Sequence, residues 1–134
     1  MRSRPLVLIA DDDPDILLLL SLTLERDGYE VVVATDGLRA LEAAFERVPH
    51  LIVLDLMMPG IDGLEVTRRL RAEAATRDVP IVIVTAFAED TQAAKALEAG
   101  ADLYLKKPFS PRDLLSKTAS LVLERRPRSR LATG

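Results

Sequence analysis

Three acidic residues, Asp11, Asp12 and Asp13, directly follow the apolar run Leu6–Ala10. If that run is a buried strand, three carboxylates crowd together at its carboxyl end. Carboxylates within a few ångströms of one another raise each other's pKa unless a cation neutralises them. Hard divalent ions prefer such oxygen ligands, so the triplet predicts a site for Mg²⁺, with Mn²⁺ as an alternative.

Other side chains that could do chemistry also follow apolar runs, namely Asp55, Thr85 and Lys107. A carboxylate such as Asp55 can act as a nucleophile toward phosphorus and form an acyl phosphate. Phosphoryl transfer depends mainly on positioning and charge neutralisation. For that reaction Lys107 offers a positive charge and Thr85 a hydroxyl donor.

The chain alternates short apolar runs with longer helical patterns. The runs lack polar alternation, as do strands buried on both faces, and they are Leu6–Ala10, Val31–Ala34, Leu51–Leu54, Ile81–Val84 and Leu103–Leu105. The helices are expected from 14 to near 28, from 37 to near 49, from 63 to shortly before 80, from 90 to 100, and from 111 to shortly before 127. This pattern predicts five βα units and a parallel sheet covered on both faces.

A closed eight-unit barrel needs far more than 134 residues. We therefore predict an α/β domain with an open, doubly wound, flavodoxin-like sheet of five parallel strands in the order 2-1-3-4-5. Ligands bind such sheets beyond the carboxyl ends of the strands, where the strand order reverses. The acidic residues Asp11, Asp12 and Asp55 are expected to converge there, beside Thr85 and Lys107.

Some polar residues near this site have plainer interpretations. Asp13 precedes Pro14 and is expected to be the N-cap of the first helix. Lys106 is expected to be a solvated neighbour of Lys107. His50, the single histidine, precedes the third strand at its far end and is expected on the surface.

Composition excludes several classes of protein. The chain is 49% apolar and 29% charged, as in a globular domain, and its net charge of −3 gives no electrostatic case for binding nucleic acid or an anionic membrane. It contains no Cys, which rules out disulfides and thiolate chemistry. The longest apolar stretch, Ile16–Leu24 with one Ser and one Thr, is far below the roughly 20 residues of a membrane span. We expect a cytoplasmic protein.

Taken in order and spacing, four stretches resemble the receiver domains of two-component response regulators, and the resemblance covers residues 5–123. They are Val7–Pro14, Asp55–Gly63, Val84–Ala86 and Lys107–Phe109. The resemblance implies that Asp55 accepts a phosphoryl group from a sensor histidine kinase or a phosphotransfer protein. It also implies that magnesium is bound by Asp11, Asp12, Asp55 and the backbone carbonyl of Met57.

The resemblance further implies a switch. Thr85 turns toward the phosphoryl group, Tyr104 rotates inward to fill the space, and the fourth helix, fifth strand and fifth helix form the output face. Such domains typically have a cis bond before the proline of the Lys107–Pro108 pair, and proline is the one residue where a cis bond costs little.

Met57 and Phe87 occupy positions that tune how long receivers stay phosphorylated. Both are large and apolar here, so we expect slow self-dephosphorylation; alternatively, both only pack locally. In the first helix, Leu18 and Leu22 lie on the side opposite the stripe of Ile16, Leu20 and Leu24. Leu18 and Leu22 are expected either to dock the kinase or to pack on the fifth helix.

Association and chain ends are less determined. Receivers of the OmpR/PhoB class dimerise through charged pairs, and Ala93, Leu103 and Glu124 lack the expected charges, so we expect a monomer or a weak dimer. Residues 1–124 are assigned to the receiver and 125–134 to a basic tail or the start of a linker. The output domain or protein is not evident.

Two other functions remain open. One is a magnesium-dependent aspartyl phosphatase, but such enzymes usually have a second Asp two residues after the nucleophile, where this chain has Met57. The other is a phosphate-independent interaction module, although such degenerate receivers usually lose an acidic or Lys site residue that this chain keeps. We therefore expect no turnover of external substrates.

Overall fold

The computed structural model describes residues 4–86, 90–107 and 110–123. The predictions made for Phe87, the Lys107–Pro108 bond, Glu124 and the tail 125–134 lie outside these residues. Ten elements alternate along the chain in the predicted order: β1 Leu6–Ala10, α1 Pro14–Arg26, β2 Glu30–Ala34, α2 Gly37–Glu46, β3 Leu51–Asp55, α3 Gly63–Ala72, β4 Ile81–Thr85, α4 Asp90–Ala99, β5 Leu103–Lys106 and α5 Pro111–Leu123.

The strands form one parallel sheet in the order β2-β1-β3-β4-β5, which confirms the predicted fold class. The register aligns the carboxyl ends of the strands. Ala10 pairs with Ala34 on one side and Leu54 on the other, and Thr85 pairs with Lys106. Residues that follow the strands are thereby brought to one edge of the sheet.

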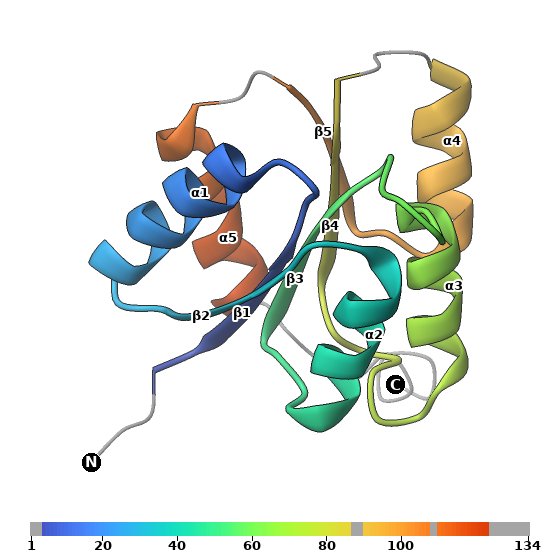
Figure 1. Cartoon of the computed structure of the whole chain (residues 1–134), viewed down its shortest axis with the longest axis horizontal. Helices are drawn as coiled ribbons and strands as arrows, with labels where there is room; N and C mark the ends of the chain where they lie inside the picture. Colours follow the sequence, from blue (N-terminus) through green and yellow to red (C-terminus); the bar gives the residue numbers. More distant parts are fainter. Residues whose placement is uncertain (1–3, 87–89, 108–109, 124–134) are drawn as a thin grey trace.

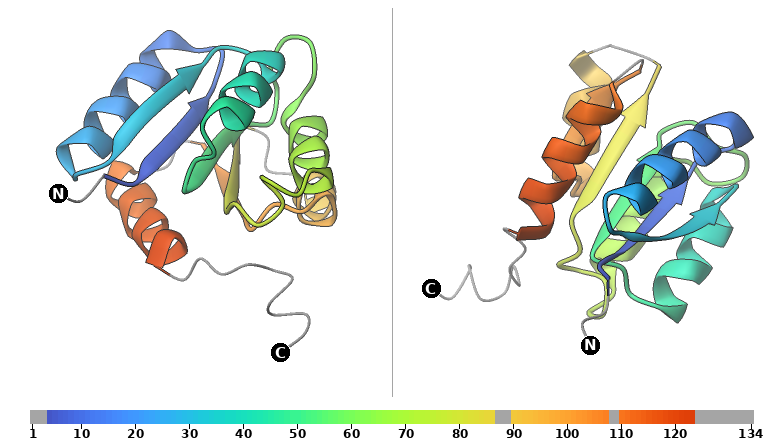
Figure 2. Two further views of the ribbon diagram at one scale, coloured as in Figure 1. Left: turned by 90° about the horizontal axis from the view of Figure 1, so that it is seen from below. Right: turned by 90° about the vertical axis from the view of Figure 1, so that its left-hand side faces the viewer.

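Helices cover both faces of the sheet: α1 and α5 lie on one face, and α2, α3 and α4 lie on the other (Figures 1 and 2). Because successive side chains of a strand point to opposite faces, β1 contributes Val7 and Ile9 to the core beneath α1 and α5. Its Leu8 and Ala10 pack into the core beneath α2, α3 and α4. The sheet is therefore buried on both faces, as the uninterrupted apolar runs predicted.

Two helices end earlier than the sequence predicted. α2 ends at Glu46 because the next residue, Arg47, has an extended backbone (φ −139°, ψ 106°). α3 ends at Ala72, well before Pro80. There the Thr76 hydroxyl donates to the carbonyl of Leu70 at 2.6 Å, so a side chain takes up a carbonyl at the helix end.

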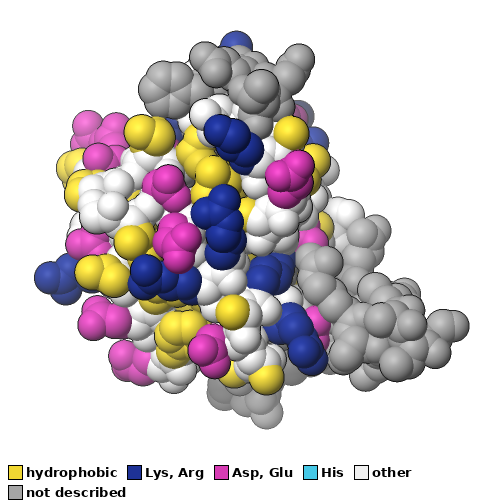
Figure 3. All heavy atoms as spheres, turned by 90° about the vertical axis from the view of Figure 1, so that its right-hand side faces the viewer, with side chains coloured by type: hydrophobic (Ala, Val, Ile, Leu, Met, Phe, Trp, Pro, Cys, Tyr) yellow, Lys and Arg dark blue, Asp and Glu magenta, His cyan; other side chains and the backbone are white. Residues whose placement is uncertain are grey.

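The outer face over α3 and α4 carries mixed charge, with basic and acidic side chains interspersed (Figure 3). On α3, Arg68 and Arg69 both pair with Glu65. Among the described residues, no helix is long and apolar enough to span a membrane.

Candidate functional site

The polar residues predicted to converge come from the carboxyl ends of four strands, β1, β3, β4 and β5. Asp55 is the last residue of β3, Thr85 is the last residue of β4, and Asp11 follows β1 directly. Backbone bonds fix these ends: the N–H of Leu56 donates to the carbonyl of Val84 at 2.9 Å, and that of Lys107 donates to the carbonyl of Thr85 at 2.6 Å. The parallel register, rather than sequence proximity, assembles the site.

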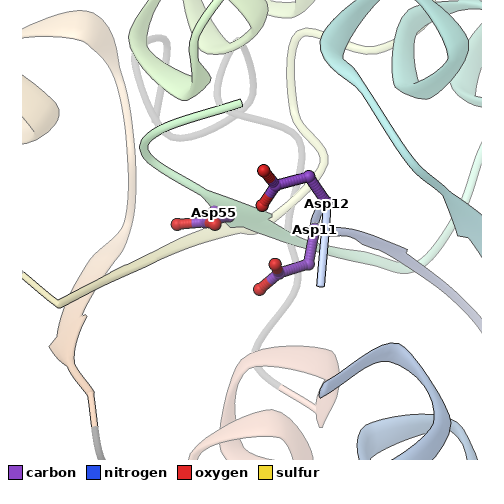
Figure 4. Close-up of side chains that lie close together, drawn as sticks. All are labelled: Asp11, Asp12 and Asp55. Carbon is purple, nitrogen blue, oxygen red and sulfur yellow. The ribbon is translucent and has the colours of Figure 1, made fainter. Parts of the chain in front are cut away.

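Three carboxylates meet at this edge. Asp11, Asp12 and Asp55 each offer an oxygen, and these atoms lie within 4.8 Å of one another. Figure 4 shows the side chains of Asp11 and Asp12 pointing toward Asp55. Asp11 and Asp55 are only 1% and 7% exposed, whereas Asp12 is exposed. A donor set of carboxylate oxygens, open to solvent on one side, fits a hard divalent cation.

Lys107 is the cation that reaches this cluster within the described part of the chain. Its Nζ lies 2.9 Å from Oδ2 of Asp11 and 3.5 Å from Oδ2 of Asp55. Partial burial lowers the pKa of Lys107, but the hydrogen bond to Asp11 and the charge of Asp55 outweigh it, so its pKa is raised. Lys107 therefore stays protonated at neutral pH.

Asp55 has an unusual protonation equilibrium. Burial, followed by the charge of Asp11, raises the pKa of Asp55 from 3.8 to about 6 against the opposing effect of Lys107. One ammonium thus leaves the excess negative charge of three carboxylates uncompensated. At pH 7 Asp55 is mostly ionised, yet its charge costs free energy that a bound cation would recover.

Asp13 has the structural role predicted for it. Its Oδ1 accepts from the N–H of Asp15 at 2.9 Å and caps α1. The N–H of Asp13 in turn donates to Oδ1 of Asp11 at 2.9 Å. The capping residue therefore also orients the buried carboxylate of Asp11.

Gly63 contributes to the site in a way that its position at the predicted start of a helix does not indicate. A Cβ at Gly63 would lie 2.7 Å from the backbone oxygen of Asp55, closer than real Cβ contacts. The N–H of Gly63 also donates to the carbonyl of Leu56 at 2.8 Å. Only glycine lets α3 begin this close to the strand end that carries Asp55. The Asp62–Gly63 pair at the end of the Asp55–Gly63 stretch was the available signal.

Two residues predicted to act in the switch and in the phosphorylated lifetime differ in burial. Tyr104 is half-buried and packs against the core beneath α2, α3 and α4. Met57 is 56% exposed. Leu18 and Leu22 are 60% and 52% exposed, so more than half of each residue is open to solvent.

Lys106 and His50 are both exposed, so they lie on the surface as predicted. His50 has an additional structural role, because its Nδ1 accepts from the N–H of Leu6 at 3.0 Å. Its own N–H donates to the carbonyl of Leu6 at 2.8 Å. His50 thus fixes the start of β1 against β3, at the end of the sheet away from the carboxylates.

Comparison with known proteins identifies the family and the fold. The family model described as response regulator receiver domain matches residues 7–119. The chain belongs to this family. The receiver is 41% identical over 118 residues to the DNA-binding dual master transcriptional regulator RpaA of Synechocystis. It is 42% identical over 116 residues to the alkaline phosphatase synthesis transcriptional regulatory protein PhoP of Bacillus subtilis.

These matches cover 88% and 87% of this chain but only 49% and 48% of RpaA and PhoP. The receiver thus spans about half the length of the curated relatives it matches. Solved structures of similar proteins agree with the assignment to the receiver family. The chemotaxis protein CheY4 of Vibrio cholerae matches with a TM-score of 0.85 and 31% identity, over 89% of this chain and 99% of that chain. A CheY-like receiver domain protein of Methanospirillum hungatei matches with a TM-score of 0.86 and 32% identity, over 91% and 96%.

The family role is to accept a phosphoryl group in two-component signalling. In this receiver, the acidic cluster of Asp11, Asp12 and Asp55 could hold a metal ion. Both statements agree with the chemistry inferred from the residues at the strand ends.

Proposed function

We propose that Asp55 is the phosphoacceptor of this receiver. The observation that carries the proposal is the position of its carboxylate: largely buried at the end of β3, with the Lys107 ammonium 3.5 Å away. An oxygen of ionised Asp55 attacks phosphorus, the new O–P bond forms, and the P–N bond of a phosphohistidine breaks, with its electron pair returning to the imidazole. Hydrolysis of the acyl phosphate by water then returns carboxylate and inorganic phosphate.

We propose that Asp11, Asp12, Asp55 and the backbone carbonyl of Met57 hold Mg²⁺, or Mn²⁺ in its place. Bound there, the ion would neutralise phosphoryl oxygens as well as the carboxylates. The receiver domain of the Pseudomonas aeruginosa sensor histidine kinase PA1611, which has a magnesium ion coordinated in its active site cleft, supports this. It matches with a TM-score of 0.83 and 30% identity, over 90% of this chain and 98% of that chain.

Lys107 and Thr85 supply the remaining interactions with the phosphoryl group. The ammonium of Lys107 neutralises a phosphoryl oxygen while its second partner, Asp11, holds it in place. The hydroxyl of Thr85, buried at the end of β4, donates to another oxygen. Movement of Thr85 and inward rotation of Tyr104 then change the surface of α4, β5 and α5, which is the proposed output face.

The central test is phosphorylation by acetyl phosphate with Mg²⁺, followed on phosphate-affinity gels because the chain contains no Trp for fluorescence. Asp55→Asn should abolish the shifted band. Asp62→Asn is the matched control, because it removes one charge nearby and Asn can still cap α3 where Asp62 accepts from the N–H of Glu65. Undiminished labelling of Asp55→Asn would overturn the assignment.

The lifetime of the phosphorylated state is the next proposal. We infer that Met57, with Phe87, hinders the attacking water and slows self-dephosphorylation. A Met57→Asn, Phe87→Glu protein should lose its phosphoryl group faster than the native receiver in a phosphate-release assay. Equal decay would mean that both side chains only pack locally.

The partner is proposed to be a sensor histidine kinase or phosphotransfer protein in the cytoplasm, docked on α1. Leu18 and Leu22, both more than half exposed, support this surface. Leu18→Ser or Leu22→Ser should slow phosphotransfer from the kinase while labelling by acetyl phosphate and stability stay unchanged. Equal loss of both reactions would point to a folding defect instead.

Turnover of external substrates is not expected. Met57, two residues after Asp55, offers no acid to a leaving group, which weighs against a phosphatase. The retained carboxylates and Lys107 weigh against a phosphate-independent module. We further propose a monomer or weak dimer, since Ala93 and Leu103 lack the charges of the OmpR/PhoB dimer.

A further inference from the structure

A hollow lies at the opposite end of the sheet from the carboxylates. Its volume is about 280 Å³, and it is lined by Pro5, Asp27, Gly28, Tyr29, Ala119 and Val122. Pro5 directly precedes β1, residues 27–29 join α1 to β2, and the other two residues belong to the second half of α5. Three segments that are far apart in sequence therefore form the walls of the hollow.

The chemistry of the hollow is apolar with one carboxylate. The side chains of Pro5, Ala119 and Val122 and the ring of Tyr29 offer apolar surface, while Asp27 is exposed and forms no salt bridge within the described residues. Burial is the main cause that raises the pKa of Tyr29, and the negative charge of Asp27 is the second. The Asp27 carboxylate therefore acts electrostatically on the Tyr29 hydroxyl. Such a surface suits a segment that offers both a cation and an apolar group.

The chain itself supplies such a segment immediately after α5. Val122 forms part of the wall, and Arg125, Arg126 and Pro127 follow within three to five residues. A chain extends at most ~3.3–3.6 Å per residue, so these residues reach roughly 10–18 Å from Val122 and need no long linker. Arg125, Arg126, Arg128 and Arg130 give this segment a strongly basic character opposite Asp27.

We propose that residues 124–134 dock on this hollow, with Arg125 or Arg126 on Asp27 and Pro127 against Tyr29 and Val122. The curated relatives are about twice as long as this receiver. Docking would fix the direction in which the chain leaves the receiver. The proposal does not depend on Asp55 or on phosphorylation.

A spin label provides the test, because the chain has no native Cys. A nitroxide on Ser129→Cys in the full chain should broaden the amide NMR signals of Gly28 and Tyr29 more than those at the amino-terminal ends of β4 and β5. Asp27→Asn should lower the docked-to-undocked ratio about two- to fivefold, as for an exposed ion pair. The matched control is Glu42→Gln, an exposed carboxylate on α2, which should leave the broadening unchanged.

Two results would overturn the proposal. One is equal broadening in the Asp27→Asn and Glu42→Gln proteins. The other is broadening of Gly28 and Tyr29 in ¹⁵N-labelled receiver mixed with a separate spin-labelled copy, which would mean that a second molecule occupies the hollow. A charge exchange, Asp27→Arg with Arg125→Glu and Arg126→Glu, should restore the native pattern.

Discussion

Arg71 and Asp102 lie near the amino-terminal ends of β4 and β5, whereas Asp11, Asp55 and Lys107 lie at the carboxyl ends of the sheet. The guanidinium of Arg71 donates to Oδ2 of Asp102 at 2.9 Å and to three backbone carbonyls, those of Gly100, Arg77 and Val79. The same Asp102 oxygen accepts from the N–H of Ile81 at 2.8 Å. At this end of the sheet one cation, Arg71, pairs with one anion, Asp102, and both side chains also form hydrogen bonds with the backbone.

At the carboxyl ends of the strands the charges are unequal, because the single ammonium of Lys107 lies beside the three carboxylates of Asp11, Asp12 and Asp55. The pKa of Asp55 is raised there, first by burial and then by the negative charge of Asp11. A balanced, hydrogen-bonded pair joins α3 to the loops that enter β4 and β5. The unbalanced cluster instead carries excess negative charge, which a bound cation would reduce. Perturbation experiments should therefore affect stability at one end and chemistry at the other.

The largest effect is expected at the balanced end. Arg71→Met should destabilise the protein by about 3 kcal/mol, because it removes the cation beside Asp102 and the donor to three backbone carbonyls. Urea unfolding would measure this. Arg69→Met, which breaks an exposed pair with Glu65 on the same helix, should leave the midpoint nearly unchanged. Similar losses of stability for both variants would remove the distinction between the partly buried network and the exposed pair.

At the carboxyl ends of the strands we predict the opposite effect on stability: removing the charge of Asp55 should stabilise the folded protein. Because the folded pKa of Asp55 is raised, its stabilising contribution is complete below 3.8 and is lost as the pH rises through about 6. Without metal, Asp55→Asn should therefore gain about 1–2 kcal/mol over the native protein between pH 4 and pH 8, after allowing for screening by solvent.

Unfolding curves across this pH range, with and without Mg²⁺, would measure the difference. Added Mg²⁺ should stabilise the native protein more than Asp55→Asn and so narrow the gap at pH 8. A stability difference that stays constant from pH 4 to pH 8 would show that folding does not raise the pKa of Asp55.

A smaller effect separates neighbouring residues within the acidic triplet. Asp12→Asn should weaken Mg²⁺ binding about tenfold, or ~1.4 kcal/mol, because one charged oxygen ligand is lost. Asp13→Asn makes the same charge change, but Asn still caps α1, so its affinity should stay near the native value. Calorimetric titration would measure both constants. A loss with Asp13→Asn as large as with Asp12→Asn would point to net charge alone.

The smallest effect is expected for a pair that is well formed but exposed. Arg47 and Glu30 make two hydrogen bonds, at 2.8 and 2.9 Å, on the protein surface. Arg47→Gln should change the unfolding midpoint far less than Arg71→Met, because water replaces the partner. A loss comparable to that of Arg71→Met would mean that burial does not set the strength of these pairs.

Much of the fold could be predicted because its signals are local. Uninterrupted apolar runs such as Leu51–Leu54 indicated strands buried on both faces, and Asp13 before Pro14 indicated a capped helix start. The end of α3 could not be predicted in this way. It depends on the Thr76 hydroxyl reaching Leu70, a contact that forms only once the following turn folds back.

The sequence by itself determined the βα order and the identities of the residues at the strand ends, because periodicity and capping act over a few residues. Only the tertiary structure decided the unequal burial of Asp11 and Asp12, the close approach of Gly63 to Asp55, and the partners of Arg71. These features join residues from different strands and loops. Their distances are set by packing and register across the whole sheet, which no local pattern encodes.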